Sequence, residues 1–384
     1  MGTDKRKIAV ITGTRAEFGI LTPVLKEINR SKKLQLQLLV TGMHLLKKFG
    51  YTVSEIEKSG FKIDAKIKIS TNSDTELEMA KSVGKAVGKI AEVLNSDRPD
   101  LLLLLGDRGE MMAGAIAAGY MNIPVGHIHG GEVSGNVDES VRHAITKLSH
   151  LHFTATEQSR ERVIKLGEAP ERVIRTGAPS LDVILKEKLY SKKQLSEKLG
   201  FKLKENYLLM VQHPVTTEFR QAVTQVRETL SALAAVDYQI VIIYPNSDVG
   251  GRQMIKEILR HGKRDNVKVF ENLEHKVYLS LLKHCSVLAG NSSSGIIEAP
   301  SFKVPVINIG QRQARRERSA NIIDVAPEKE LIKKALKKAL SNKFKETADN
   351  TANVWGNGTA SRSIVRVLES YPVNNDLLKK QITY

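Results

Sequence analysis

The sequence contains a single cysteine, Cys285, among its 384 residues. One thiol excludes a disulfide framework and fits a reducing compartment. No apolar run approaches the roughly 18–20 residues of a membrane-spanning helix. The apolar stretch Ile8–Ile11 is also far too short for the hydrophobic region of a secretion signal. We therefore expect a cytoplasmic protein without a membrane partner.

Aromatic residues are also scarce, at 5% of the chain, and 42 acidic residues are outnumbered by 59 lysines and arginines. The formal charge of +17 raises the alternative of a basic nucleic-acid-binding protein. Such a protein should carry basic clusters interleaved with aromatic residues, whereas the lysines here are scattered over predicted helix faces. A lysine-rich solvated surface is the favoured interpretation, and no nucleic-acid partner is expected. A basic field would also attract a polyanionic small substrate.

The chain does contain a regular alternation of short apolar runs and amphipathic helical segments. Its length is too great for one ordinary core, so two domains are expected. Strands alternating with helices predict an α/β fold made of two Rossmann-like domains. We expect the first domain over residues 1–180 and the second over 181–359, with a terminal helix at about 360–384 packing back on the first.

The predicted strands are compact apolar segments that end at polar or glycine residues. In the first domain they are Lys7–Thr12, Gln35–Thr41, Phe61–Ile69, Leu101–Leu105, Val125–His129, His150–Thr154 and Val173–Thr176. In the second they are Tyr207–Gln212, Gln239–Tyr244, Val267–Phe270, Ser286–Ala289 and Val304–Ile309.

Two neighbouring strands of the first domain are each followed by glycine and then by a carboxylate. Asp107 comes after the first of them and Glu132 after the second. Ligands of doubly wound sheets lie beyond the carboxyl ends of the strands, so we expect these two acids side by side at the mouth of one cleft. Asp138 and Arg142 follow at helical i, i+4 spacing and are expected to pair on one helix face. His44 also follows a strand.

Clustered carboxylates favour general acid–base chemistry, because neighbouring acids shift one another's pKa values. A metal site is the alternative, since His44, His127 and His129 lie nearby in the sequence. Strand alternation would place His127 and His129 on one side, where they could instead pack beneath helices. The sequence shows no metal-binding spacing of His or Cys, and no metal is expected. Asp138 could alternatively cap its helix.

Two further segments have the pattern of an anion site at the start of a helix. Gly13-Thr14-Arg15 joins the first strand to a helix, and Arg15 suits a phosphate or carboxylate. The lack of GxGxxG gives no indication of a dinucleotide. The segment Gly290–Glu298 places Ser292 and Ser293 at a predicted helix start, with Glu298 in its first turns. Serine capping is the plainer alternative.

His213, between a strand and Pro214, is expected to face the same cleft from the second domain. A satisfied loop histidine is the alternative there.

Several of these segments resemble UDP-N-acetylglucosamine 2-epimerases, and most closely the hydrolysing branch of sialic-acid and legionaminic-acid biosynthesis. The segments are GTRAE at 13–17, GDR at 106–108, HIHGGEVSGNVDESVRHAITKLSHLHF at 127–153, QHPVTTE at 212–218 and GNSSSGIIEAP at 290–300. The non-hydrolysing branch carries a lysine five residues after the arginine of its first motif. Here that position is Ile20, which favours the hydrolysing branch.

The resemblance implies a glycosyltransferase-B-like fold with UDP in an interdomain cleft. It implies UDP contacts from Arg15, His213, Ser292, Ser293 and Glu298, with Asn246 and the backbone near Glu271 as weaker additions. It places Asp107, Glu132, Asp138, Arg142 and His44 on the sugar side. It implies no metal or nicotinamide cofactor, and homodimers or homotetramers as the assembly.

The implied reaction is anti elimination of UDP to a 2-acetamidoglucal, followed by hydration to a free 2-epimeric sugar. Such a reaction needs a base, an acid and a stabiliser of positive charge at C1, which three carboxylates supply in some order. A non-hydrolysing epimerase and a glycosyltransferase remain alternatives, although the acid cluster disfavours the latter. The sequence leaves open whether the sugar is N-acetylglucosamine or its 2,4-diacetamido-6-deoxy analogue.

Overall fold

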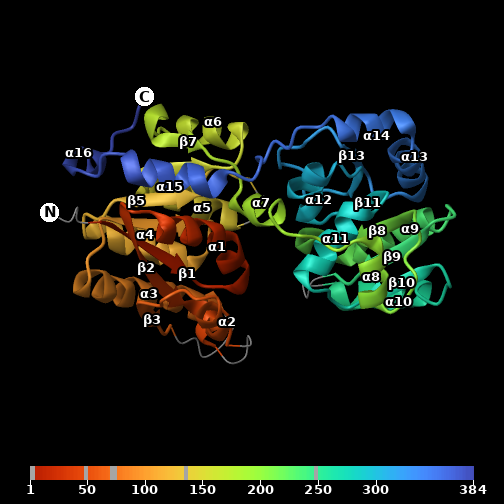
Figure 1. The fold of residues 1–384 in the computed structure, drawn as a ribbon, viewed down its shortest axis with the longest axis horizontal. Helices are drawn as coiled ribbons and strands as arrows, with labels where there is room; N and C mark the ends of the chain where they lie inside the picture. The colour runs from red at the N-terminus through yellow and green to blue at the C-terminus, as the bar shows by residue number, and fades with distance from the viewer. Residues whose placement is uncertain (1–4, 47–50, 70–75, 134–136, 246–249) are drawn as a thin grey trace. The chain divides into compact units, whose positions relative to one another are not determined.

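The computed structural model describes residues 5–46, 51–69, 76–133, 137–245 and 250–384. They form two compact units, one of Met1–Val183 with Trp355–Tyr384 and one of Ile184–Val354 (Figure 1). Each unit contains one parallel sheet with helices on both faces. The predicted class, two Rossmann-like α/β units of the glycosyltransferase-B-like kind, is confirmed.

The first sheet has seven parallel strands in the order β3-β2-β1-β4-β5-β6-β7. Their bounds are β1 Arg6–Thr12, β2 Leu34–Thr41, β3 Ala65–Ile67, β4 Leu101–Leu105, β5 Val125–Ile128, β6 Leu151–Thr154 and β7 Val173–Arg175. The prediction for the third strand was too long, because only Ala65–Ile67 within it forms β3 and pairs with β2.

The first unit's helices and short 3-10 turns connect these strands. They are α1 Arg15–Arg30, η1 Gly42–Leu45, α2 Val53–Lys58, α3 Glu76–Ser96, α4 Gly109–Tyr120, α5 Val137–Leu148, α6 Glu157–Lys165, η3 Pro170–Arg172, α7 Pro179–Ile184, α15 Ala360–Ser370 and α16 Asn375–Leu378.

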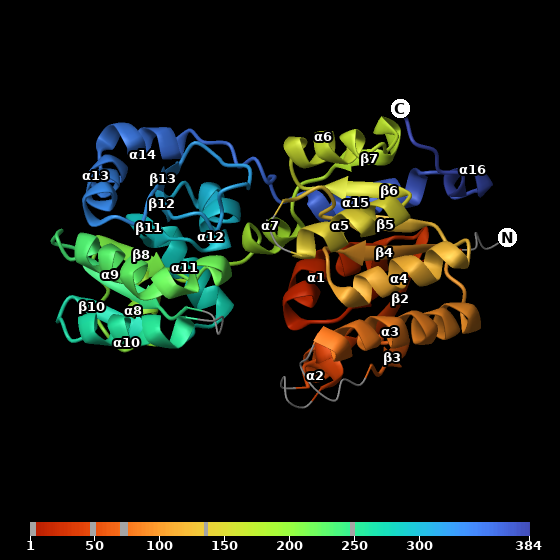
Figure 2. The same ribbon diagram turned by 180° about the vertical axis from the view of Figure 1, so that it is seen from behind.

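The apolar runs are continuous because the central strands are buried on both faces. Ile8 and Val10 of β1 pack in a cluster with α1 and α15. Ala9 and Ile11, the alternate residues, pack with α3 and α4 in a second cluster. Figures 1 and 2 show these helix pairs on opposite faces of the sheet.

The second sheet has six parallel strands in the order β10-β9-β8-β11-β12-β13. Their bounds are β8 Tyr207–Val211, β9 Gln239–Ile243, β10 Val267–Phe270, β11 Val287–Gly290, β12 Val306–Ile309 and β13 Ile322–Val325. The edge strand β13 was missing from the prediction. Its half-exposed side chains do not form the solid apolar run by which the other strands are recognised.

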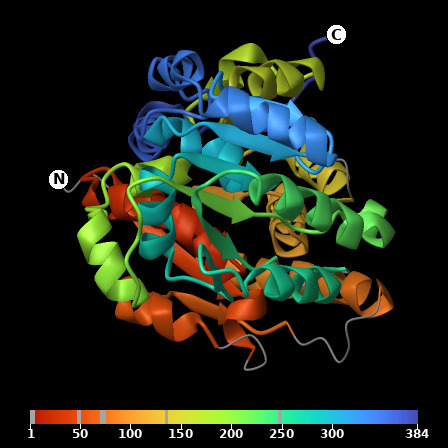
Figure 3. The same ribbon diagram turned by 90° about the vertical axis from the view of Figure 1, so that its right-hand side faces the viewer.

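Helices cover both faces of this sheet as well. They and the 3-10 turns are α8 Lys192–Leu199, η4 Thr216–Gln221, α9 Ala222–Leu233, α10 Gly251–His261, α11 His275–His284, α12 Ser293–Ile297, η5 Ala299–Phe302, α13 Lys329–Ala339 and α14 Asn342–Asp349. The apolar faces of α9, α10 and α13 share one core cluster, and those of α8 and α11 share the other. Figure 3 shows the two groups on opposite sides of the strands.

None of the helices in the described part of the chain combines the length and apolar character needed to span a bilayer.

Candidate active site

The strand order of each sheet reverses beside its first strand, between β1 and β4 and between β8 and β11. Ligands of open parallel sheets bind at the carboxyl ends of the strands at such a point. The residues that follow these four strands are Gly13, Gly106, Gln212 and Asn291. Several predicted site residues therefore lie within a few residues of these reversal points, whereas Glu132 follows β5 and His44 follows β2.

The turn after β1 is fixed by Glu17. Its Oε2 accepts hydrogen bonds from the backbone N–H groups of Gly13 at 3.0 Å and Thr14 at 2.9 Å, while the Thr14 hydroxyl caps α1. These two N–H groups belong to the predicted anion site at the start of α1, and the capping box already pairs both of them. Arg15 stays on the surface, with a 75% exposed side chain that pairs with Glu55 at 3.0 Å. Exposed pairs of this kind are weak, so Arg15 can exchange Glu55 for a phosphate.

Glu17 also belongs to a charged cluster that our sequence interpretation missed. Arg108 Nε lies 3.3 Å from a carboxylate oxygen of Glu110 and 3.9 Å from one of Glu17. Burial, reinforced by Glu110 and opposed by Arg108, raises the pKa of Glu17 to about 7. Glu110 fits only because Gly42 has no side chain, since a Cβ there would lie 2.4 Å from its Oε1. The glycines after β1 and β2 therefore make room for a carboxylate beside Arg108.

Arg142 joins the two acids predicted to lie at the ends of β4 and β5. Its guanidinium donates to Asp107 Oδ2 and, over 2.6 Å, to the backbone carbonyl of Glu132. Arg142 is only 5% exposed, whereas the Asp107 side chain keeps 26% of its surface accessible. A buried arginine with two such partners holds the Asp107 carboxylate in one orientation. One face of that carboxylate remains open to a ligand.

The Glu132 carboxylate has a different partner, His129. Its Oε1 lies 2.5 Å from His129 Nδ1. The prediction that His127 and His129 share one side of a strand is wrong, because β5 ends at Ile128 and His129 has a φ of +66°. The left-handed conformation brings the His129 side chain to Glu132, so His129 does not follow the side-to-side alternation of the strand.

Asp138 lies inside α5, whose first residue is Val137, so it is not the residue that precedes the helix as a cap. Its side chain is outside the described part of the structure. The described partners of the Arg142 guanidinium are Asp107 and the backbone carbonyl of Glu132. The expected pairing of Arg142 with Asp138 stays a prediction.

His44 is a buried residue with both ring nitrogens occupied. Nε2 lies 3.1 Å from the Thr12 hydroxyl and Nδ1 lies 2.7 Å from the Thr52 hydroxyl. Burial lowers the pKa of His44, so the ring is neutral and hydroxyl-bonded. The two hydroxyl groups thereby hold the His44 ring at the end of β2.

In the second unit, Asn291 organises the segment after β11. Its side chain accepts from the backbone N–H of His213 at 2.7 Å and donates to the carbonyl of the same residue at 2.8 Å. Asn291 is 1% exposed, so this two-point bond ties the ends of β8 and β11 together. The backbone of His213 is thereby fixed.

The three serines Ser292, Ser293 and Ser294, called the serine loop below, lie at the start of α12. Ser292 is the N-cap, its hydroxyl 2.9 Å from that of Ser294, and Ser293 is the first helical residue. The capping alternative is therefore correct for Ser292, while Ser293 is half-buried. The predicted place of Glu298 is wrong: α12 has five residues, and Glu298 is its C-cap. Burial raises the pKa of Glu298 to about 7.

Arg312 and Gln313 were missed by our sequence interpretation. Both donate to the backbone carbonyl of Asn291 over 3.1 Å, from the loop after β12. A guanidinium is thereby held beside the serine loop. The available signal was the basic run at 312–318, which follows a strand that ends next to Gly310.

Glu271 follows β10 and is exposed. Asn246 lies outside the described residues. Among the described side chains, no group of three or more His, Cys, Asp or Glu is arranged to hold a metal ion.

Comparison with known proteins identifies the class of protein that this fold and these strand-end residues define. Residues 26–369 match the family described as UDP-N-acetylglucosamine 2-epimerase. The chain belongs to this family.

Two relatives and one solved structure illustrate the similarity. A Legionella pneumophila protein named UDP-N,N'-diacetylbacillosamine 2-epimerase (hydrolyzing) is 41% identical, over 99% of this chain and 100% of its own. A Campylobacter jejuni protein named GDP/UDP-N,N'-diacetylbacillosamine 2-epimerase (hydrolyzing) is 38% identical over 89% of each chain. The structure of Neisseria meningitidis UDP-GlcNAc 2-epimerase bound to UDP-GlcNAc is similar in fold, with a TM-score of 0.78 at 23% identity over 94% of this chain and 99% of that one.

Proposed function

We propose that this protein is a hydrolysing UDP-sugar 2-epimerase. In this proposal it converts a UDP-2,4-diacetamido-6-deoxy sugar and water into UDP and the free 2-epimeric sugar. The observation that carries the proposal is the buried Arg142, which orients a partly accessible Asp107 beside the backbone of Glu132. The hydrolysing reaction and the diacetamido sugar are favoured over UDP-GlcNAc because the two relatives described above are both named for that reaction on such a sugar.

UDP is proposed to bind mainly the residues that follow β8, β11 and β12. The Ser293 hydroxyl and the Arg312 guanidinium would contact phosphate oxygens, a pairing that arginine geometry suits. Glu298 would accept a hydrogen bond from a ribose hydroxyl. The remaining proposed UDP contacts are Ser292, His213, Arg15, Asn246 and the backbone near Glu271.

The sugar is proposed to face Asp107. The carboxylate takes the proton from C2 while the bond from C1 to the phosphate oxygen breaks, so that UDP leaves with the electron pair. Arg142 keeps the Asp107 carboxylate aimed at that proton. The phosphate contacts stabilise the leaving group as its charge develops, which is the larger share of such catalysis.

Hydration of the resulting 2-acetamidoglucal completes the reaction. Water adds its oxygen to C1, and C2 receives a proton on the face opposite to the one that lost it. The Glu132–His129 pair is proposed to remove the proton from water, and a protonated Asp138 is proposed to donate the proton that C2 receives. The sugar leaves with inverted configuration at C2 and a free hydroxyl at C1.

Incubation in D₂O with each of two UDP-sugars tests this function. We expect UDP and free sugar carrying deuterium at C2 from the UDP-diacetamido sugar, detected by proton NMR, with UDP-GlcNAc turned over at least about tenfold more slowly, because a specificity pocket discriminates by one or two contacts. Asp107→Asn purified in parallel controls for contaminating activity. An intact UDP-sugar 2-epimer as the product would instead establish the non-hydrolysing reaction.

Removing the Asn291 side chain should weaken UDP binding without touching any phosphate contact directly. Asn291→Ala leaves the backbone N–H and carbonyl of His213 without these partners, at a cost of roughly 1–3 kcal/mol for each buried group left unpaired. We expect the Kd for UDP, measured by calorimetry, to rise at least about tenfold. Asn350→Ala, at an exposed asparagine bonded to the Glu346 carbonyl, is the control and should leave Kd unchanged. Equal values for the two variants would remove Asn291 from the site.

A further inference from the structure

The segment after α15 is fastened to the first unit by contacts at two points. Arg172 donates to the backbone carbonyls of Asp376, Leu377 and Lys379 at 2.9 to 3.2 Å, and so caps the end of α16. Beyond it, the Thr383 N–H donates to the Gly167 carbonyl at 3.3 Å. The chain between these two points carries Lys380.

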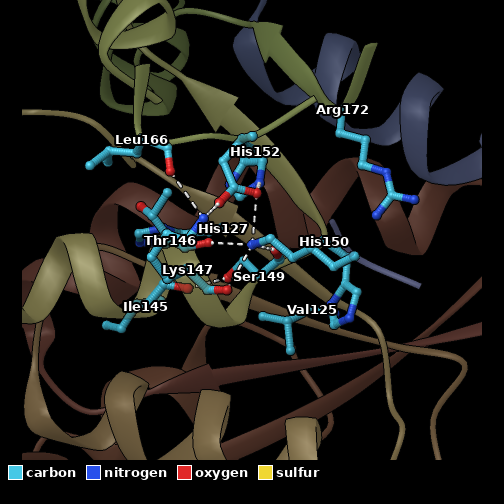
Figure 4. A network of polar contacts seen from close by, with 12 residues as sticks. Val125, His127, Ile145, Thr146, Lys147, Ser149, His150, His152, Leu166 and Arg172 are labelled. Atoms are coloured by element: carbon cyan, nitrogen blue, oxygen red, sulfur yellow. Dashed lines mark hydrogen bonds and ion pairs between the residues drawn. The ribbon is translucent and has the colours of Figure 1, made fainter. Parts of the chain in front are cut away.

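Lys380 extends to the carboxyl end of α5. Its Nζ donates to the backbone carbonyls of Thr146, Lys147 and Ser149 at 3.1, 2.7 and 2.6 Å. These carbonyls lie at the end of the helix, where few intrahelical N–H groups remain to pair them. Figure 4 shows the three residues converging on one nitrogen. A cation at this place also interacts favourably with the helix dipole.

The ammonium is itself held by Glu168. Glu168 is 1% exposed and contacts Lys380 at 2.7 Å, Lys147 at 2.7 Å and His152 Nε2 at 3.1 Å. Although burial opposes its ionisation, the hydrogen bonds from these three residues lower the pKa of Glu168 to about 2. A carboxylate that is ionised throughout the physiological range therefore fixes Lys380 at the end of α5.

A hydrogen-bond chain runs from this helix end to the residue before Asp107. The Thr146 hydroxyl lies 3.1 Å from His127 Nδ1, and His127 Nε2 lies 2.7 Å from the Gly106 carbonyl. Burial lowers the pKa of His127 to about 3, so its ring is neutral. Because a carbonyl can only accept, Nε2 carries the proton and Nδ1 accepts from Thr146. Arg142, one turn before Thr146 on α5, contacts Asp107, the residue after Gly106.

We propose that Lys380 is a positioning residue for the Asp107–Arg142 pair, acting by fixing the end of α5 and, through Thr146 and His127, the backbone at Gly106. This inference rests on the proposed function of Asp107. Lys380 lies near the end of the chain, far from Arg142 in the sequence, where helix periodicity and strand ends give no hint of the connection. Small displacements of catalytic groups are costly in rate. Loss of the ion pair between Lys380 and Glu168, called the clasp below, should therefore lower kcat.

The test compares Lys380→Met with Lys379→Met. Methionine keeps most of the length of the side chain and removes the charge. Lys379 has a 74% exposed side chain whose ammonium pairs with the surface residue Asp376 at 3.0 Å, so it is the matched control. We expect kcat to fall about 5- to 20-fold in Lys380→Met with KM changed less than about twofold, while Lys379→Met behaves as the wild type. Lys380→Arg, which restores a cation, should recover most of the lost kcat.

A pH profile separates positioning from a general loss of folded protein. Burial lowers the pKa of Lys380 to about 8, so its charge is present below pH 8 and is lost as the pH rises through that value. Glu168, Lys147, His152, His150 and Arg172 are the ionisable groups around it. We expect wild-type kcat to decline above pH 8, the decline to be absent in Lys380→Met, and Lys380→Arg to keep its kcat to higher pH.

Thr146→Val breaks the hydrogen-bond chain at its middle and keeps the shape of the side chain. Its kcat loss should be less than additive with that of Lys380→Met, as expected for two residues in one network. Fully additive losses, a Lys380→Met kcat within twofold of Lys379→Met, or a kcat loss equal to the fraction of unfolded protein would each overturn the proposal.

Hydrogen exchange keeps the outcome distinct from that of the proposed function. Amides of residues 106–112 and 140–148 should exchange faster in Lys380→Met than in Lys379→Met, whichever reaction the enzyme performs. Failure of the wild type to release UDP would overturn the proposed function while this comparison still decides whether the clasp exists. Unchanged exchange in both segments would overturn the clasp even in an active enzyme.

Discussion

Asp107→Asn is expected to lower kcat by at least about a thousandfold, the largest loss that any single substitution in the first unit should cause. Asparagine keeps the shape of the side chain and can still accept from Arg142, but it cannot take a proton from C2. General-base catalysis by one positioned group contributes about 10²- to 10⁴-fold. Turnover is measured as UDP released in a coupled assay. Asp349→Asn, an exposed position at the end of α14, is the control and should retain wild-type kcat.

UDP affinity distinguishes a catalytic loss from a damaged protein. The proposed UDP contacts lie mainly in the second unit, so Asp107→Asn should bind UDP with a Kd within about threefold of the wild type, a difference below about 1 kcal/mol. A second check is exchange of the C2 proton with D₂O, which should disappear together with UDP release. Near-normal turnover in this variant would show that the base is another residue, and Asp138 would be the next to test.

The fold class was accessible from the sequence because the central strands are buried on both faces. Leu101–Leu105 is entirely buried in β4, and five consecutive leucines ending at Gly106 are typical of such a strand. The prediction failed at two of the four edge strands, β3 and β13, and succeeded within one residue at the other two, β7 and β10. Strands there have one neighbour and partly exposed side chains, so hydrophobic pattern carries less information.

The candidate site was accessible in part because parallel strands bring their ends together. Strand-end reasoning predicts Asp107 and Glu132 side by side, and Arg142 contacts the Asp107 carboxylate and the Glu132 backbone carbonyl. Helix spacing predicts Asp138 as a partner of Arg142, since spacing reports only neighbours on the same helix. That pairing stays a prediction, because the Asp138 side chain lies outside the described residues. The contact of Arg142 with Asp107, 35 residues earlier, depends on how α5 packs against the sheet. That packing is a tertiary property without a local signature.

Backbone conformation was a second reason why parts of the site could not be predicted from the sequence. The left-handed turn at His129 changes the side on which alternation would place it, and a non-glycine residue gives no warning of a positive φ. The charged set of Glu17, Arg108 and Glu110, of which only Glu17 is buried, comes from two separate stretches of the sequence, so no motif reveals it. Lys380 and Glu168 are separated even further. Charged residues buried by tertiary partners resemble ordinary surface charges in the sequence.

Gly290→Ala should be the most damaging small substitution in the second unit. Gly290 has a φ of +134°, a conformation that residues with a side chain rarely adopt. A Cβ at this position would lie 2.1 Å from the Val211 carbonyl oxygen and 2.6 Å from its carbon. Since Gly290 pairs with Val211 across β11 and β8, the methyl group would force the two strands apart at their carboxyl ends.

We expect the backbone strain and the clash together to destabilise the second unit by roughly 3–5 kcal/mol. Gly200→Ala is the matched control, because Gly200 also has a positive φ, +72°, but a Cβ added there would meet no atom within 4 Å. That change should cost only about 1–2 kcal/mol, the ordinary penalty of a left-handed alanine. Urea unfolding measures the loss of stability in each variant. Hydrogen exchange of residues 207–213 and 287–292 then shows whether the loss lies in the second unit.

The consequence of Gly290→Ala for ligand binding follows from Asn291, the next residue. Asn291 accepts from the His213 backbone N–H over 2.7 Å and so holds the two strand ends together, and a strand displaced by a methyl group breaks that bond. The carbonyl of Asn291 would also move away from Arg312 and Gln313, so the guanidinium beside the serine loop would lose its support. The Kd for UDP should therefore rise at least about 30-fold, or about 2 kcal/mol, in Gly290→Ala and remain within about threefold of wild type in Gly200→Ala. If Gly290→Ala matched the control in both stability and affinity, the close approach of β8 and β11 would not be what shapes the proposed UDP site.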